Sequence, residues 1–265
     1  MSLLSMAVFD QEGSGRTEIT KRTLENLLET VDFNRHRMFI IDNASCFETK
    51  DVIAKFAGNF SAVGRYPMEQ LTVLTNDENL GTAKAVNMGL RERRPQEHCV
   101  KMDNDVIVYQ QHWLDELERA IEMEPAIGIL GLKRKDLGEY PQAREPHFQT
   151  TLTMLPHKPG QPWVVFETVK HGVMGTCTMF NWRLLDKIGY LHQPTLYGWD
   201  DGLISTRSKI AGFVNGFLPH IEIDHIDPGN TFYQAWKEER AAEASRLAGI
   251  LNHEYLEGIR PIYEP

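Results

Sequence analysis

The sequence has few cysteines, no long apolar run and no excess of positive charge, and each absence argues against a class of protein. Three cysteines among 265 residues are too few and too widely spaced for the disulfide framework of a small secreted scaffold. No apolar run approaches the ~20 residues that cross a bilayer. Lysine and arginine number 28 against 37 aspartate and glutamate, so we expect no nucleic-acid partner, because that role needs a surface that neutralises phosphates.

Three common nucleotide-binding and catalytic motifs are also missing. The chain has no P-loop, no Gly-x-Gly-x-x-Gly after its first apolar segment and no Gly-x-Ser-x-Gly turn. These absences weigh against a simple NTPase, a dinucleotide oxidoreductase and a serine hydrolase. Residues 1–9 lack the basic start of a signal peptide and are expected to form a strand. Together with the unpaired cysteines, this start favours a cytoplasmic protein without a transmembrane segment.

Apolar strands alternate with amphipathic helices over the first 130 residues. The predicted strands share a buried, apolar character and end in polar residues; they lie at 3–9, 37–41, 71–74, 100–102 and 127–132. Between them, apolar residues recur at helical spacing. Strand alternating with helix predicts right-handed crossovers and an α/β fold, with a mostly parallel central sheet flanked by helices.

The pattern becomes less regular after about residue 132. Prolines gather there, and a hairpin is predicted around residues 156–162. Toward the end of the chain a charged helix is expected to pack over the outside. Since no repeat or linker interrupts the chain, we predict one domain over residues 1–265. Its parts are a first half at 1–108, an elaborated second half at 109–230 and a helical tail at 231–265.

The strongest single signal is the pair Asp103 and Asp105, which directly follows a predicted strand. Residues two apart in an extended segment point to the same side. Paired carboxylates suit a hard divalent cation, with phosphate oxygens completing its coordination shell. The alternative is a solvated turn, since Asp-x-Asp occurs often by chance. The position at a strand's carboxyl end, where α/β sheets bind ligands, favours the cation site.

Three further segments carry candidate residues. The helix predicted from Thr82 offers N–H groups at its start that could bind an anion, and Asn79, Gly81 and Lys84 lie near that start. The small residues of this helix are instead expected to allow tight packing of the helix on the sheet; they are Ala83, Ala85 and Gly89. Asp200 and Asp201 follow Trp199 before another helix: one acid could cap that helix, and the second suggests a general base beside a ring that stacks on a sugar. His225, at the end of an alternating strand, is a plausible cation ligand.

Taken together and in this order, the motifs resemble the GT-A glycosyltransferases, especially family 2. The segments that carry the resemblance are Ile40-Ile41-Asp42-Asn43, Asn79 to Gly89, Asp103-Asn104-Asp105, and Gly198-Trp199-Asp200-Asp201 with Arg207 and Gly212 downstream. They span roughly residues 3 to 225. The resemblance implies a GT-A, Rossmann-like fold whose first half binds a nucleotide sugar and whose second half binds the acceptor.

The resemblance also implies a role for each matching residue. Asp42 would bind the base of a nucleoside-diphosphate sugar, first of all a UDP-sugar, with Asp10 beside it. Asp103 would approach the ribose, and Asp103, Asp105 and His225 would hold Mn²⁺ or Mg²⁺. Asn79, Gly81, Lys84, Trp199 and Asp200 would complete the substrate site. Asp201 would be the general base that activates the hydroxyl of an unidentified acceptor, a glycan or a small molecule, in an inverting transfer.

Two alternatives stay open at this point. One is a sugar-1-phosphate nucleotidyltransferase, for which Gly13-Ser14-Gly15-Arg16 is a thin version of the usual Gly-rich loop. The other is a catalytically silent protein of GT-A shape that binds a sugar nucleotide or a carbohydrate. Asp201 argues against the second, because a binding protein has no need of a general base. The sequence also departs from the family pattern, since Asp200 replaces a usual Glu and Leu203 a frequent acid.

Overall fold

The computed structural model describes residues 1–62, 66–136, 150–155, 164–169, 172–227 and 231–265. Its described strands form one sheet in the order β3-β2-β1-β4-β9-β6-β10-β8-β7, with β5 paired to β10. The strands are β1 (Ser2–Val8), β2 (Arg37–Asn43), β3 (Leu71–Asn76), β4 (His98–Met102), β5 (Val106–Val108), β6 (Ile127–Arg134), β7 (Thr150–Met154), β8 (Val165–Val169), β9 (Cys177–Phe180) and β10 (Val214–His225). The helices are α1 (Thr17–Thr30), α2 (Phe47–Ala62), η1 (Met68–Gln70), α3 (Thr82–Leu90), α4 (Trp113–Met123), α5 (Trp182–Ile188), α6 (Asp200–Ile210) and α7 (Thr231–Leu256).

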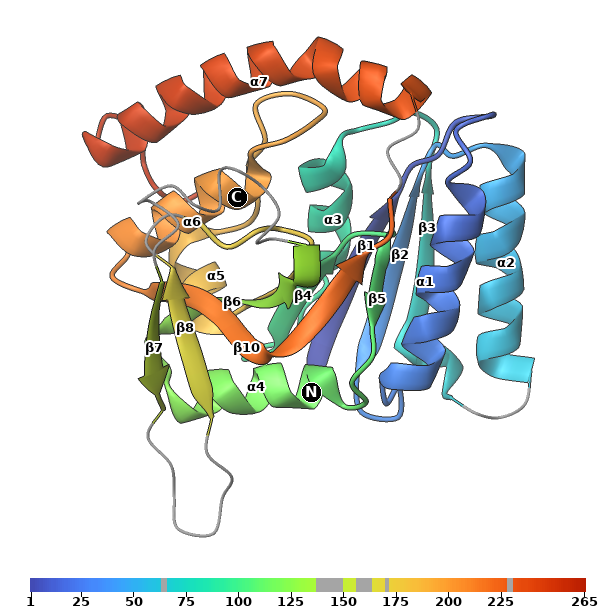
Figure 1. Ribbon diagram of the computed structural model, residues 1–265, viewed down its shortest axis with the longest axis horizontal. Coiled ribbons are helices and arrows are strands. Elements are labelled where there is room, and N and C mark those ends of the chain that lie inside the picture. Colours follow the sequence, from blue (N-terminus) through green and yellow to red (C-terminus); the bar gives the residue numbers. More distant parts are fainter. Residues whose placement is uncertain (63–65, 137–149, 156–163, 170–171, 228–230) are drawn as a thin grey trace, which may run out of the picture.

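The sheet confirms the predicted α/β architecture. Strands β3, β2, β1 and β4 pair in parallel, and β10 is parallel to β6. Strand β9 runs antiparallel to both β4 and β6 and joins the two parallel groups. The hairpin predicted in the second half is β7 paired antiparallel with β8, and its turn at 156–162 lies outside the described residues. Because β9 is antiparallel to both β4 and β6, the two parallel groups run in the same direction; β1, β2 and β3 can be followed side by side in Figure 1.

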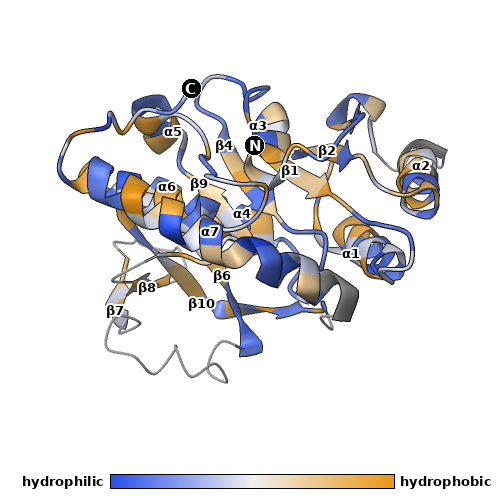
Figure 2. Ribbon diagram, turned by 90° about the horizontal axis from the view of Figure 1, so that it is seen from above, coloured by the Kyte–Doolittle hydropathy of each residue, from blue (hydrophilic) through white to orange (hydrophobic). Residues whose placement is uncertain are grey.

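Helices cover both faces of the sheet because successive strand residues point to opposite sides. In β1, Leu4 packs with the buried side chains of α1, α2 and α4, whereas Leu3 packs with those of α3 and α5. Both leucines are fully buried. Hydrophobic strands at the centre of the molecule are visible in the view from above (Figure 2). The continuous apolar runs of the sequence therefore match strands buried on both faces.

Helix α7 crosses the molecule at the edge toward which β1, β2 and β3 point (Figure 1). It packs against α6, and its buried side chains include Ala244, Ala248 and Tyr255. Most of its other described side chains are exposed or half-buried. Within the described residues, no helix is both long enough and apolar enough to cross a membrane.

Gly89 lets α3 lie directly on the sheet, as the small residues of this helix predict. A Cβ at this position would come 2.8 Å from the Cβ of Phe39 and 3.0 Å from the Cβ of Ser5. The two elements are also joined by a hydrogen bond, in which the Ser5 hydroxyl donates to the carbonyl oxygen of Val86 at 2.8 Å. The two residues that a Cβ at position 89 would meet belong to strands, Ser5 to β1 and Phe39 to β2, so neither can move away without distorting the sheet.

We expect Gly89→Ala to lower the free energy of unfolding by about 1–3 kcal/mol, because overpacking forces strand or helix to shift. Gly58→Ala in α2 is the matched control. A Cβ there would meet no atom within 4 Å, so the better helix propensity of alanine should raise stability by about 0.5–1 kcal/mol. Urea unfolding of the two variants measures both values. Equal effects of the two substitutions would contradict tight packing at Gly89.

Candidate active site

A cleft of about 700 Å³ opens at the carboxyl edge of the sheet, between the strand ends, the start of α6 and α7. Many of the residues singled out in the sequence line it. They are Asn79, Asp103, Asp105, Trp199, Asp200, Asp201 and His225. The fold thus brings the Asp-x-Asp turn and the second acidic pair to one cavity, although almost a hundred residues separate them in the chain.

Asp105 lines the cleft, and a buried arginine and a histidine contact it. Nη2 of Arg16 donates to Oδ2 of Asp105 at 2.9 Å, and Nε2 of His225 lies 3.3 Å from the same oxygen. Nη1 of Arg16 also pairs with Asp227 at 2.6 Å. Despite burial, the hydrogen bond and charge of His225 and the charge of Arg16 hold the pKa of Asp105 well below its ordinary value. Asp105 is therefore a fixed negative charge.

The side chains around Asp105 have the donor types that a divalent cation accepts, but Asp103, Asp105 and His225 do not bring three ligand atoms within 4.8 Å of one another. Among the described residues only His36, Asp115 and Glu118 do so.

The second oxygen of Asp105, Oδ1, is buried and has no hydrogen-bond partner in the described part of the structure. Burying a carboxylate oxygen without a partner is costly, so such an atom marks a place for a ligand. Carboxylate oxygens and one imidazole nitrogen are ligands that Mn²⁺ accepts, and the oxygens also suit Mg²⁺. The pairing with Arg16 means that a cation would share Asp105 with a guanidinium or displace it.

Lys101 links the two acidic pairs. Its side chain is buried, and Nζ lies 3.2 Å from Oδ1 of Asp103 and 3.3 Å from Oδ2 of Asp200. Burial opposes the charge on Lys101, but the carboxylates of Asp103, Asp200 and Asp201 outweigh it and raise the pKa of the ammonium above its ordinary value. Burial, together with Asp105 and Asp200, raises the pKa of Asp103.

Asp201 is held by backbone groups at the first turn of α6. Its Oδ2 accepts from the N–H of Gly175 at 3.1 Å, and its Oδ1 accepts from the N–H of Gly202 at 2.7 Å. Burial and the neighbouring Asp200 raise the pKa of Asp201. A carboxylate fixed in position, with a pKa moved toward neutrality, has the properties of a general base.

Trp199 and α7 form an aromatic wall of the cleft. Trp199 adopts a left-handed backbone conformation, with φ of 70°, directly before α6. Its indole is 42% exposed and donates from Nε1 to the hydroxyl of Ser245 in α7 at 3.1 Å. Trp236 of α7 packs edge-on against Tyr197, with ring centroids 5.7 Å apart. The prediction of a tail packed over the outside is therefore incomplete, because α7 contributes Trp236 and Lys237 to the cleft.

Hydrogen bonds to side chains hold the loop before α3 and the first turn of that helix. The Nδ2 of Asn43 donates to Oδ1 of Asn79 at 2.8 Å, and that oxygen also accepts from the N–H of Gly81. The N–H of Ala83 donates to Oε1 of Gln193 at 3.1 Å. The expectation that the start of α3 offers free N–H groups to an anion is thus wrong for Gly81 and Ala83, since side chains have already taken them.

Four of the predicted site residues lie outside the lining of the cleft: Asp10, Asp42, Gly81 and Lys84. The carboxylate of Asp10 is buried and accepts from the hydroxyls of Ser14, Thr17 and Thr49, so it organises the turn before α1. Lys84 is exposed on α3. Asp42 differs from both, because its buried Oδ2 has no hydrogen-bond partner among the described residues and Lys50 is 3.9 Å away.

Several residues of the cleft were not given a role by the sequence. Arg16 belongs to the Gly-rich segment that resembles a nucleotidyltransferase loop, and Lys101 lies two residues before Asp103 of the Asp-x-Asp motif. The sequence pattern assigns a catalytic or binding role to neither. A lysine within an otherwise apolar strand was the available signal for Lys101. Trp236 offered no local signal, because only the folding of α7 across the sheet edge brings it to Tyr197. Arg207, part of the resemblance, is fully buried, and its Nη1 donates to the carbonyl of Ile188 at 2.8 Å.

Comparison with known proteins identifies the family. The model of glycosyl transferase family 2 matches residues 15–189. No curated protein matches the chain. Similar solved structures include the mannosyltransferase PcManGT from Pyrobaculum calidifontis in complex with GDP-Man and Mn²⁺, with a TM-score of 0.65 and 19% identity over 91% of this chain and 60% of that one.

Two other structures share the fold. TarS 1-349 of S. aureus in complex with UDP-GlcNAc has a TM-score of 0.61 and 13% identity, covering 95% of this chain and 66% of that one. GalNAc-T7 with UDP, GalNAc and Mn²⁺ has a TM-score of 0.60 and 12% identity, covering 85% and 43%. This chain spans less than two thirds of the length of each of the three structures. At these identities the likeness shows the GT-A fold alone.

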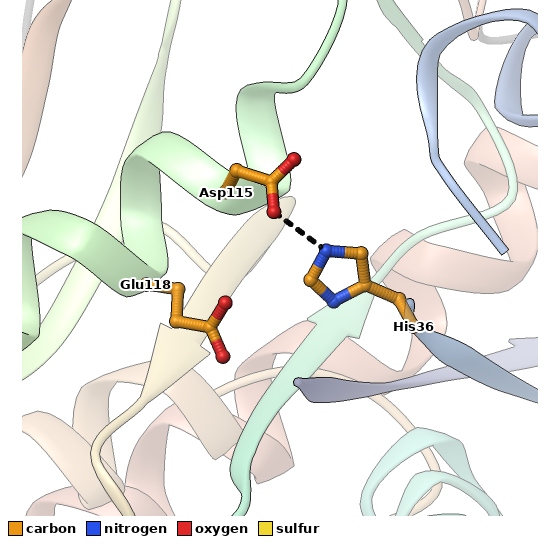
Figure 3. Close-up of side chains that lie close together, drawn as sticks. All are labelled: His36, Asp115 and Glu118. Carbon is orange, nitrogen blue, oxygen red and sulfur yellow. Dashed lines mark hydrogen bonds and ion pairs between the residues drawn. The ribbon is translucent and has the colours of Figure 1, made fainter. Parts of the chain in front are cut away.

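A second group of metal-ligating side chains lies at the opposite edge of the sheet, where β2 begins. His36 points toward Asp115 and Glu118 of α4 (Figure 3). However, Nδ1 of His36 accepts from the N–H of Ser2 at 3.1 Å, so Nε2 carries the proton and donates to Asp115 at 3.0 Å. Glu118 pairs with Arg35 at 2.6 Å. Both imidazole nitrogens are engaged, and this group is a structural polar cluster.

We expect His36 to make the protein less stable in mild acid. Burial lowers the pKa of its imidazole below 6.5 in the folded chain, so below about pH 6.5 the unfolded chain binds a proton that the folded chain does not. Stability should therefore fall as the pH drops from about 7 to about 5.5. Urea unfolding at both pH values should show a smaller loss for His36→Gln, which cannot titrate. An equal loss in both proteins would exclude this role of His36.

Proposed function

This chain belongs to glycosyl transferase family 2, and we propose that it moves a sugar from a nucleoside-diphosphate sugar to an acceptor hydroxyl, with a divalent cation and inversion at the anomeric carbon. The observation that carries this proposal is the cleft at the carboxyl edge of the sheet. It holds a carboxylate with an unpartnered oxygen, Asp105, and a second carboxylate suited to act as a base, Asp201.

The donor would occupy the side of the cleft formed by β1, β2 and β4. Asp42 lies outside the lining of the cleft, and the support for its contact with the base of the nucleotide is its buried Oδ2, which has no hydrogen-bond partner among the described residues. Asp103, at the end of β4, would face the ribose. Asn79 would line the same side. A UDP-sugar is the first donor to test, because two of the similar structures contain uridine nucleotides, whereas the mannosyltransferase contains GDP-Man.

The cation would be held by Asp105, His225 and Asp103. When bound, Mn²⁺ or Mg²⁺ neutralises the negative charge that develops on the leaving diphosphate. Asp105 is suited to this because it stays ionised beside Arg16 and His225. Arg16 would have to leave Asp105 or share it, and its pairing with Asp227 gives the guanidinium a second partner.

The acceptor would enter on the side formed by Trp199 and α7. An exposed indole offers a flat apolar face on which a sugar ring can stack, and Asp200 and Asp201 lie at the start of the following helix. Asp201 would take the proton from the acceptor hydroxyl as that oxygen attacks the anomeric carbon. The backbone N–H groups of Gly175 and Gly202 hold both of its oxygens, so the base is fixed before substrate arrives.

A catalytically silent binding protein is the second candidate from the sequence. It would need the donor side of the cleft but no base. The raised pKa of Asp201, caused by burial and Asp200, favours the enzyme, since it moves the carboxyl toward the range in which a base works best. The nucleotidyltransferase alternative loses its support, because Arg16 of the Gly-rich loop is engaged with Asp105 and Asp227 and the family is one of glycosyltransferases.

Binding of one nucleoside diphosphate should depend on metal and on Asp105. We expect UDP, GDP, dTDP or CDP at ~100 times its Kd to stabilise the wild type by about 2.7 kcal/mol with Mn²⁺, and less without it. Asp105→Asn should lose the metal-dependent part, because a neutral amide is a poor cation ligand. Asp51→Asn on the exposed side of α2 is the matched control. The measurement is the thermal shift of each protein with the nucleotide, with and without Mn²⁺. An equal shift with and without Mn²⁺ in the wild type and in both variants would contradict a cation site at Asp105.

Asp201→Asn should abolish transfer and leave nucleotide binding in place. Loss of a general base costs about 10²–10⁴-fold in rate, while Asp201 lies on the acceptor side, away from the proposed nucleotide contacts. The rate of UDP or GDP release and the product's anomeric configuration by NMR are the measurements, and inversion is expected. Asp186→Asn, an exposed acid on α5, is the control. Undiminished transfer by Asp201→Asn would show that another group is the base, and a retained configuration would exclude direct displacement.

A further inference from the structure

Lys101 is a buried ammonium whose hydrogen-bonding capacity is matched by three acceptors. The residue is 4% exposed. Its Nζ donates to the carbonyl oxygen of Gly175 at 2.8 Å and pairs with Asp103 at 3.2 Å and Asp200 at 3.3 Å. An ammonium carries three N–H donors. Each can therefore be directed at a different acceptor, which fixes the position of the group without help from water.

The three acceptors belong to three separate segments of the chain. Asp103 follows β4, Gly175 precedes β9, and Asp200 begins α6. In the proposed reaction Asp103 faces the donor, and Asp200 lies next to Asp201, the proposed base. A single ammonium thus connects the donor side of the cleft with the acceptor side.

The peptide groups of Gly175 extend this connection to Asp201. While its carbonyl accepts from Lys101, its N–H donates to Oδ2 of Asp201 at 3.1 Å. A second hydrogen bond joins the same segment to the Asp-x-Asp turn, because the N–H of Asp103 donates to the carbonyl of Thr176 at 2.9 Å. Displacement of Lys101 would therefore move both a donor-side carboxylate and the backbone group that holds the base.

Gly175 is the residue that gives the ammonium its place. A Cβ at this position would lie 2.7 Å from Nζ of Lys101 and 3.0 Å from Cβ of Asp201. Lys101 could yield only by lengthening its ion pairs with Asp103 and Asp200, and Asp201 only by a shift of the first turn of α6. Any larger residue here must push the ammonium or the base out of position.

Among the described residues, Lys101 is the cation that pairs with the acidic residues at the start of α6. Oδ2 of Asp200 is buried and has no hydrogen bond in the described structure, and its ion pair is with Lys101. Arg16, the other buried cation of the cleft, pairs with Asp105 and Asp227 instead. Without Lys101, the carboxylates of Asp103, Asp200 and Asp201 would repel one another in a poorly solvated place.

We propose that Lys101 is a positioning residue for the transfer reaction, which holds Asp103 and the pair Asp200 and Asp201 at a fixed separation. This inference rests on the proposed function, since the two sides of the cleft have their meaning only in the transfer. The ammonium does not touch the reacting atoms in this role. It acts through the carboxylates and through Gly175, so its removal should weaken catalysis only while those partners are present.

A double-mutant cycle tests this dependence. The variants are Lys101→Met, which keeps length and removes charge, Asp200→Asn, and the two combined; Lys55→Met, on an exposed helix position, is the control. The assay is release of UDP or GDP from UDP-glucose, UDP-GlcNAc and GDP-mannose with Mn²⁺, in which water takes the place of the unidentified acceptor and receives the sugar. We expect Lys101→Met to lower kcat by about 100-fold, the loss that a misplaced group of about 1 Å can cause. In the Asp200→Asn background the same substitution should cost far less.

Each outcome leads to a different conclusion. Equal losses in both backgrounds would mean that Lys101 is only structural, and unchanged kcat in Lys101→Met would overturn the inference outright. If Lys101→Met fails to fold, Gly175→Ala decides, because it keeps the charge and displaces the ammonium; wild-type kcat in a folded Gly175→Ala protein would reject the proposal. A wild type that binds none of the nucleoside diphosphates with Mn²⁺ and releases nucleotide from none of the three donors would instead refute the proposed function, and this inference with it.

Discussion

Negative charge buried at the carboxyl edge of the sheet must be balanced, and the site is built around that balance. Arg16 pairs with Asp105 and Asp227, whereas Lys101 pairs with Asp103 and Asp200. Buried carboxylates without such partners would repel one another and lose their hydration. Arg16 thus balances the part of the cleft where Oδ1 of Asp105 has no hydrogen-bond partner among the described residues. Lys101 spans from Asp103 to the start of α6, where backbone N–H groups hold both oxygens of Asp201.

The fold delivers these charges to one place through its strand order. β4 carries Lys101 and the Asp-x-Asp turn, and β9 inserts beside it in the antiparallel direction, so that the segment before β9 meets the end of β4. Gly175 lies in this segment and contacts both Lys101 and Asp201. Helix α7 then covers the same edge and adds an aromatic wall. The opposite edge carries the cluster of His36, Asp115 and Glu118. Both ring nitrogens of His36 already have hydrogen-bond partners there, so the imidazole has no free nitrogen for a ligand.

Much of this protein could be predicted from the sequence, because local pattern is enough for it. Apolar runs separated by helical stripes determine an α/β sheet, and in such a sheet polar residues after strands must gather at one edge. Asp103 and Asp105 could be selected on that ground, and Trp199 and Asp201 as an aromatic ring and an acid before a predicted helix. The structure places all four around one cleft. Gly89 was interpreted through packing alone, and its contacts with β1 and β2 agree.

Only the tertiary structure decided which residues share partners. Asp10, like Asp103, lies just beyond the end of a strand, yet its carboxylate accepts hydrogen bonds from three hydroxyls, those of Ser14 before α1, Thr17 in α1 and Thr49 in α2. The N–H of Ala83 is taken by Gln193, over a hundred residues away, and Trp236 reaches the cleft only because α7 crosses the sheet edge. Such contacts depend on strand order and on helix placement, which are set by packing between distant segments. The local sequence determines which residues can carry chemistry, and the packing of distant segments determines which of them remain free to do so.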